Sequence, residues 1–225
     1  RDGDDPLAER EANLRNRLLK DIPAVVSHTD GKLEAILITG DLARSGKSAE
    51  YDVARGWLDE LCALVGLHHT SILMCPGNHD VDRDALDVPR QMVNHNLREC
   101  PTNLVDARVD ELLRDPDFLL APLEAYQEFA ARCACDADKR LAWELEEPIR
   151  FGDGYGLAIR GASTVINSDR HDGEGTMAVQ TNQMIVKEQR GVIHMLLMHH
   201  GPSFWRNPKP APADLDNNIV LYGHT

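Results

Sequence analysis

The sequence has few aromatic residues, no long apolar run and no even set of cysteines. Aromatic residues make up 5% of the 225 residues, and the five cysteines are scattered along the chain. A membrane-spanning helix needs about 18 consecutive apolar residues, a length that no stretch approaches. An odd number of scattered cysteines is typical of reduced thiols in a cytosol rather than of a secreted disulfide framework. We therefore expect a soluble, cytoplasmic protein with no membrane partner.

Basic residues are also scarce. The chain has 24 Lys and Arg against 37 Asp and Glu, so its formal net charge is −13. This balance argues against unaided binding of duplex or other long nucleic acids, which normally requires a basic face. Binding of small anionic substrates is still compatible with this charge, because a bound metal ion can outweigh the surface charge locally. Cys133 and Cys135 form a lone C-x-C, which predicts thiols on a helix surface rather than zinc ligands.

The apolar residues, 42% of the chain, follow an α/β alternation. Helices are expected over 7–28, 48–65 and 178–189, and strands over 33–39, 70–75, 149–151, 157–167, 192–198 and 218–222. Residues 84–147 break the alternation, because they hold helical patterns at 105–113 and 118–134 and no convincing strand. We interpret 84–147 as a helical insertion in a single domain that covers 1–225.

Polar side chains that can bind metals come directly after the predicted strands. They are Asp41, the run Asn78-His79-Asp80, the pair His199-His200, and His224. Ligand sites of open α/β sheets lie at the carboxyl edge of the strands. Glycine precedes Asp41, Asn78 and His224, and we expect it to permit tight turns there. Each residue alone is explained by turn or cap chemistry, but their joint occurrence favours one site.

The loop between the first strand and the next helix is not a phosphate-binding P-loop. That motif needs four residues between its two glycines. Five residues separate Gly40 from Gly46 here, and the first of them is the acid Asp41. The loop is therefore interpreted as part of the metal-binding set.

These motifs resemble those of the calcineurin-like metallophosphoesterase superfamily and follow its order along the chain. They are Gly40-Asp41, Gly77-Asn78-His79-Asp80, His199-His200-Gly201-Pro202 and Gly223-His224. The wider segments GDLARSGKSAEY and PGNHDVDR are similar to the bacterial branch with cyclic-nucleotide phosphodiesterases, and to phosphoesterase domains of multidomain proteins. The resemblance implies a four-layer αββα sandwich of two mixed sheets and a centre of two divalent metal ions. Mn²⁺ is favoured, with Fe, Zn, Ni or Mg as alternatives.

The resemblance also implies a role for each residue. Asp41 would bridge the two ions, and Asn78, His199 and His224 would bind the second ion. A metal-bound hydroxide would be the nucleophile. His79 would protonate the leaving-group oxygen, with Asp80 orienting the His79 ring. His200 would lie near the substrate.

Two motif elements of the family differ in this sequence. The family opens with a strand and Asp-x-His, whereas Asp2 and Asp4 here follow no strand and are interpreted as a loop. The family closes with Gly-His-x-His, and the second histidine is absent after Thr225. We expect truncation at both ends rather than degeneration of the first metal site.

Three functions remain open at this stage. The first is metal-dependent hydrolysis of a phosphoester, with a nucleotide or cyclic-nucleotide phosphodiester as the favoured substrate and a phosphoprotein as a less favoured one. The second is a nuclease that acts with a basic partner or an extra domain, and the third is a non-catalytic module that lacks the first metal. The 84–147 insertion would cap the site or dock a partner, or would be a solvated hairpin without a role. Further domains or a homo-oligomer are compatible with all three.

Overall fold

The structure, a computed structural model, describes residues 6–28, 33–133, 135, 141–152, 154–184, 189–206 and 218–224. The α-helices in these ranges are α1 (Pro6–Ser27), α2 (Ser48–Val65), α3 (Val88–Glu99), α4 (Val105–Leu112), α5 (Pro116–Leu120) and α6 (Glu124–Ala130). The strands are β1 (Ile36–Ile38), β2 (Ile72–Met74), β3 (Ala142–Glu144), β4 (Ile149–Phe151), β5 (Tyr155–Ala162), β6 (Val192–Leu197) and β7 (Asn218–Leu221). The expected α/β class is confirmed. None of the helices described here is long and apolar enough to cross a membrane.

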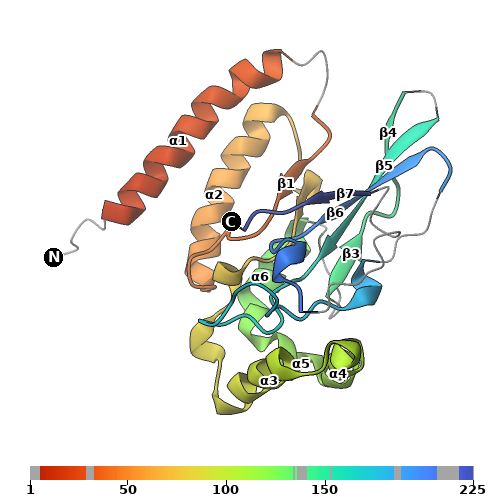
Figure 1. Ribbon diagram of the computed structural model, residues 1–225. Helices are drawn as coiled ribbons and strands as arrows, with labels where there is room; N and C mark the ends of the chain where they lie inside the picture. The colour runs from red at the N-terminus through yellow and green to blue at the C-terminus, as the bar shows by residue number, and fades with distance from the viewer. Residues whose placement is uncertain are drawn as a thin grey trace.

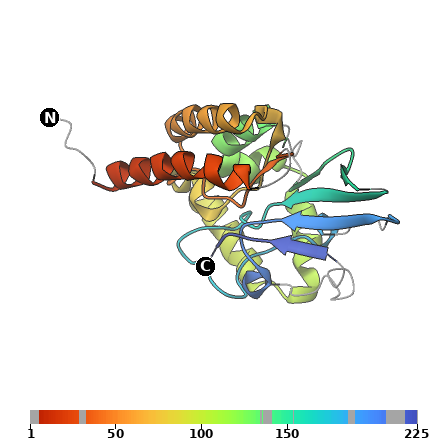
Figure 2. The ribbon, with the colours of Figure 1, turned by 90° about the horizontal axis from the view of Figure 1, so that it is seen from above.

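The strands form two sheets whose carboxyl ends meet. β1 and β2 pair in parallel, with Ile36 opposite Ile72. The second sheet has the order β3-β5-β6-β7, and β4 also pairs with β5. β5, β6 and β7 are parallel, whereas β3 and β4 run antiparallel to β5. α1 and α2 lie side by side, apart from the layer of β5, β6 and β7 (Figures 1 and 2).

Helix α2 begins and ends where the sequence predicts. Its buried residues recur at helical spacing and face the core: Tyr51, Ala54, Leu58, Leu61 and Cys62. The first turn is held by the carboxylate of Glu50, which accepts hydrogen bonds from the backbone N–H groups of Lys47 at 3.2 Å and Ser45 at 3.0 Å. Gly66 ends the helix in the left-handed region with φ 72°.

The segment 84–147 differs from the predicted helical insertion in two ways. Its last part forms β3, which adds an antiparallel strand to the larger sheet. Its helices are not a solvated hairpin, because they contribute fully buried residues to the core, among them Leu97, Val105 and Val109. In α6, the ring of Phe129 stacks on Tyr51 with ring centroids 5.4 Å apart. The insertion is therefore an integral part of the hydrophobic core.

Two further predictions are wrong. The helix expected over 178–189 is a single 3-10 turn, Thr181–Gln183, within the described part of that range. Residues 178–180 are instead irregular and buried, and the backbone N–H of Ala178 donates to the side chain of Asn167 at 2.9 Å. Cys133 and Cys135 are not on a helix surface, since only 3% and 2% of their surfaces are exposed. Burial raises the pKa of Cys133 to about 11 and that of Cys135 to about 12, so both thiols stay protonated and inert.

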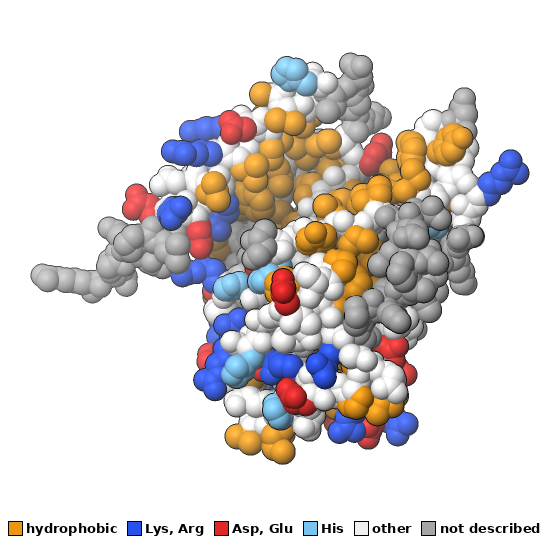
Figure 3. Space-filling model, in the orientation of Figure 1, with side chains coloured by type: hydrophobic (Ala, Val, Ile, Leu, Met, Phe, Trp, Pro, Cys, Tyr) orange, Lys and Arg blue, Asp and Glu red, His pale blue; other side chains and the backbone are white. Residues whose placement is uncertain are grey.

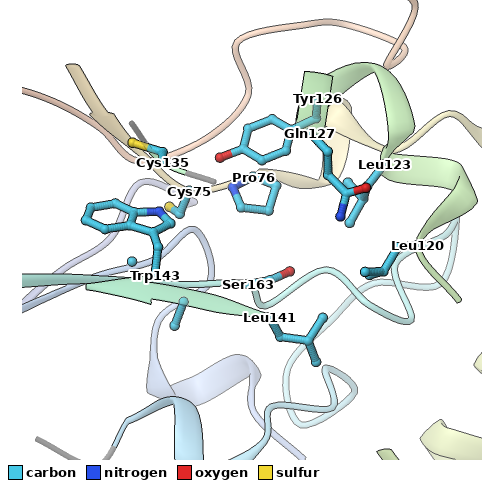
Figure 4. A pocket seen from close by; sticks show the side chains of 12 residues that line it. Cys75, Pro76, Leu120, Leu123, Tyr126, Gln127, Cys135, Leu141, Trp143 and Ser163 are labelled. Atoms are coloured by element: carbon cyan, nitrogen blue, oxygen red, sulfur yellow. The ribbon is translucent and has the colours of Figure 1, made fainter. Parts of the chain in front are cut away.

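Trp143 of β3 joins the two sheets. Its indole N–H donates to the backbone carbonyl of Met74 in β2 at 2.7 Å. The ring lies over Gly161 of β5, where a Cβ atom would approach the indole to 2.2 Å. Figure 4 shows Trp143 pointing from its strand toward Cys75 and Pro76, beside a cavity of about 30 Å³. A cavity of this volume is large enough to hold a water molecule.

The hydrogen bond of Trp143 can be tested by comparison with Trp57, whose buried indole N–H has no partner among the described residues. Trp143→Phe leaves the Met74 carbonyl buried without this donor, and we expect it to lower the free energy of unfolding by about 1–3 kcal/mol. Trp57→Phe removes no hydrogen bond and should cost about 1 kcal/mol less. Urea denaturation of both variants measures the difference, and equal losses would contradict the role of the inter-sheet bond.

Candidate metal centre

The four predicted metal ligands lie together where four strands end. Asp41 follows β1, Asn78 follows β2, His199 follows β6 and His224 follows β7. Three of these side chains surround one atom, Nε2 of His199. Its distances are 2.9 Å to Oδ1 of Asn78, 3.1 Å to Nδ1 of His224 and 3.5 Å to Oδ2 of Asp41. The fold therefore brings donors from both sheets to one point.

Two glycines allow the loops of the two sheets to approach so closely. Gly40 has φ 96°, a left-handed conformation. A Cβ on Gly40 would lie 2.7 Å from Nδ1 of His199, and a Cβ on Gly77 would lie 2.2 Å from Oδ1 of Asp41. Gly77 itself has φ −103°, so at this position close approach, and not the expected tight turn, requires glycine. Gly223 likewise does not have a positive φ, and a Cβ added to it would lie 2.3 Å from the hydroxyl oxygen of Thr39.

The protonation of His199 suits a cation. Its Nδ1 lies 2.7 Å from the backbone carbonyl of Thr39, which can only accept, so Nδ1 carries the proton. In the neutral ring Nε2 then presents a lone pair, and Oδ1 of Asn78 faces it with another lone pair at 2.9 Å. Two acceptors at this distance repel each other unless a proton or a metal ion lies between them. Donation of the second ring nitrogen to a backbone carbonyl is also typical of metal-binding histidines.

His200 is fully buried beside this cluster. Candidate ligand atoms of His199, His200 and His224 lie within 4.8 Å of one another, so the three histidines could hold a metal ion. The Thr164 hydroxyl lies 3.0 Å from Nδ1 of His200, whereas Nε2 has no hydrogen-bond partner in the described chain. Burial, together with His199 and His224, lowers the pKa of His200 to about 3. The ring is thus a neutral imidazole, the form that binds metals.

His79 is exposed at the edge of the centre. Its backbone N–H donates to Oδ1 of Asp41 at 3.0 Å. The sequence led us to expect that Asp80 orients this ring, but Asp80 does not hydrogen-bond to it. Instead, Nδ1 lies 2.9 Å from the carbonyl oxygen of Arg44, which orients the ring. Nε2 therefore is the nitrogen that can exchange a proton with a substrate.

Asp80 holds the two metal-binding loops together, because it is buried between them with 0% of its surface exposed. Its carboxylate accepts hydrogen bonds from the backbone N–H groups of Asp41 at 2.8 Å, Ala43 at 2.9 Å and Gly77 at 2.8 Å. The hydroxyl of Tyr51 adds a fourth bond at 2.9 Å. Asp41 has φ 58°, a strained conformation for a residue other than glycine, and the bond to its N–H helps to hold it there.

Two residues of the site were not identified from the sequence. Tyr51 belongs to the apolar stripe of α2, and nothing in that pattern indicates that its hydroxyl binds Asp80. Thr164, whose hydroxyl also accepts from the backbone N–H of His200 at 3.1 Å, lies where the sequence predicts a continuing strand. β5 ends earlier, at Ala162. Trp205 anchors its loop, since its indole N–H donates to the carbonyl of His200 at 2.9 Å.

The bond between Tyr51 and Asp80 has a matched control in Tyr126, whose buried hydroxyl has no partner among the described residues. Burial and the charge of Asp80 raise the pKa of Tyr51, so its hydroxyl remains a donor. We expect Tyr51→Phe to lower the free energy of unfolding by about 1.5–3 kcal/mol, because hydrogen bonds to charged groups are strong. Tyr126→Phe should change it by less than about 0.5 kcal/mol. Equal effects in urea denaturation would show that the Tyr51 bond contributes little.

Comparison with known proteins agrees with the geometry. The family model described as calcineurin-like phosphoesterase matches residues 12–225. No match to the sequence was found among curated proteins. The matched range contains every strand found in the described residues and every side chain of the cluster. The chain therefore belongs to the calcineurin-like phosphoesterase family and is a metal-dependent hydrolase of phosphoesters.

Proposed function

We propose that the protein hydrolyses a phosphodiester, with a nucleotide or cyclic nucleotide as substrate, and that it belongs to the bacterial cyclic-nucleotide phosphodiesterase branch of its family. The observation that carries the proposal is the convergence of Asp41, Asn78 and His224 on Nε2 of His199. The net charge of −13 favours small nucleotides over duplex nucleic acid. The two sheets would form the inner layers of an αββα sandwich in one domain, in which α3–α6 cap the site.

In this proposal Asn78, His199 and His224 would hold one divalent ion, and Asp41 would bind both this ion and a second one. The donors are one carboxylate, one amide oxygen and two imidazoles, a set that suits Mn²⁺ and also Fe, Zn or Ni. When bound, the ions supply Lewis acidity toward phosphate oxygens and lower the pKa of a water molecule that attacks phosphorus. His200 is a further candidate ligand, because its buried Nε2 has no hydrogen-bond partner in the described chain.

His79 acts as the general acid in this scheme. The Arg44 carbonyl accepts from Nδ1, so the proton that reaches the leaving-group oxygen is carried on Nε2. The backbone of His79 is tied to Asp41, which keeps the ring at the rim of the centre. Asp80 contributes indirectly, because its carboxylate fixes the two loops that carry Asp41 and His79.

His79→Ala tests this role. We expect turnover of bis(p-nitrophenyl) phosphate to fall by about 10²–10⁴-fold, the usual contribution of a general acid. Metal content, measured by atomic emission, should stay near that of the unmodified protein. His28→Ala, which removes an exposed histidine directly after α1, is the control and should keep full activity. Loss of metal together with retained activity would assign His79 to metal binding instead.

Removal of the metal tests the centre itself. Dialysis against a chelator should abolish turnover, and added Mn²⁺ should restore it. Asn78→Ala should weaken Mn²⁺ binding, measured by calorimetry, by at least about tenfold. Asn103→Ala, on the exposed surface of the inserted segment, should bind Mn²⁺ as the unmodified protein does. Full activity after complete chelation would contradict a metal-dependent reaction.

A further inference from the structure

A second cavity lies between α3 and the loop that follows β5. Its volume is about 490 Å³, within the range of small-molecule binding sites. Six basic or polar side chains line it: Arg83, Gln91, His95, Arg98, Arg170 and His171. None of them belongs to the predicted metal centre. The cavity is therefore a separate feature that the hydrolytic site does not explain.

The lining is positively charged although the protein is strongly acidic. Three arginines face two acids, Glu99 and Asp169, so the formal charge is 3 − 2 = +1 with both histidines neutral. The chain as a whole carries −13. Figure 3 shows Lys, Arg and His side chains gathered, with acidic ones among them, in the lower part of the face below α1 and β7. The lining of the cavity thus carries a net positive charge on a protein whose total charge would repel an anion.

One wall of the cavity is rigid. The guanidinium of Arg98 pairs with Asp169 at 2.9 Å, and the two side chains are only 13% and 12% exposed. It also donates to the carbonyl of Asn167 at 3.2 Å. The amide of Asn94 in α3 donates to the carbonyl of Ser168 at 3.3 Å. These bonds fix the loop on α3, while the buried Nε of Arg98 keeps no partner in the described chain.

The guanidinium groups of Arg83 and Arg170 take no part in these hydrogen bonds. Both residues are exposed, and neither forms an ion pair with a residue in the described ranges. Two unpaired guanidinium groups at a cavity are suited to a phosphate, which they can bind through paired N–H donors.

The cavity lies beside the metal centre. Arg83 comes three residues after Asp80, at the start of the turn Arg83–Ala85. The carboxylate of Asp80 accepts hydrogen bonds from the backbone N–H groups of Asp41 and Gly77, so Arg83 follows directly after a loop of the metal centre. A substrate held at the metal centre can therefore extend toward the arginines.

We infer that this cavity binds a second phosphate of the substrate, carried by a nucleotide-sized group next to the phosphodiester that is cleaved. The inference rests on the proposed function. Among the substrates of the proposed function, it favours a nucleotide that carries a further phosphate, as in a short linear oligonucleotide. A cyclic mononucleotide, which has no second phosphate, would be the poorer substrate.

Calorimetry with two probes tests this assignment on the metal-loaded protein. Adenosine 3′,5′-bisphosphate and adenosine 5′-monophosphate differ by one phosphate, so contacts of the metal centre with the shared phosphate cancel in the ratio of their affinities. We expect the bisphosphate to bind at least about tenfold more tightly, because hydrogen bonds to charged groups are strong. The double variant Arg83→Gln, Arg170→Gln should lose this preference. Arg17→Gln, which removes an exposed charge from α1, should retain it.

Two results would overturn the assignment: no preference in the unmodified protein, or the same preference in the double variant. Hydrolysis of bis(p-nitrophenyl) phosphate, which has no second anion, separates this from the proposed function. Hydrolysis without tighter binding of the bisphosphate would contradict only the second phosphate site. Preference without hydrolysis would support the phosphate site and contradict the phosphodiesterase.

Discussion

The buried carboxylate of Asp80 is the interaction on which the metal centre depends. It lies between the loops that follow β1 and β2 and accepts hydrogen bonds from the N–H groups of Asp41, Ala43 and Gly77. Burial raises its pKa, although the bonds from Gly77, Ala43 and Tyr51 oppose the shift. A carboxylate in such a place is costly unless all its acceptors are used, so the loops are held in the one arrangement that satisfies it. That arrangement places Asp41 and Asn78 at the centre.

A second constraint connects the two sheets. The carbonyl of Thr39 after β1 accepts from Nδ1 of His199 after β6, and this bond fixes both the ring and its proton. The approach is possible only because Gly40 and Gly77 have no side chains where the loops meet. The atoms that face Nε2 of His199 are Oδ1 of Asn78, Nδ1 of His224 and Oδ2 of Asp41. The hydrogen bond between Thr39 and His199 therefore both connects the two sheets and orients His199 toward a cation.

The sequence was sufficient to predict which residues gather, because the carboxyl ends of parallel strands meet by construction. It was not sufficient to predict what each buried polar group contacts. Asp80 accepts hydrogen bonds from backbone N–H groups of two loops. Two of the donors, Ala43 and Asp41, are 37 and 39 residues away in the sequence, so only the folded chain shows these contacts. β3 was missed although Leu141, Trp143 and Leu145 alternate at strand spacing, a signal obscured by the helical residues before it. The helix expected over 178–189 does not form at its start, where the backbone N–H of Ala178 instead donates to the side chain of Asn167. Here a tertiary contact overrides the local helical pattern.

The central claim is that side chains from four strands hold a divalent cation at Nε2 of His199. Anomalous diffraction from crystals soaked in Mn²⁺ tests it most directly, because it locates the ion independently of activity. The account predicts an anomalous peak at coordination distance, about 2.0–2.3 Å, from Nε2 of His199 and in contact with Asn78 and His224. A Mn²⁺ peak elsewhere, or the absence of a peak at this cluster in fully soaked crystals, would contradict it.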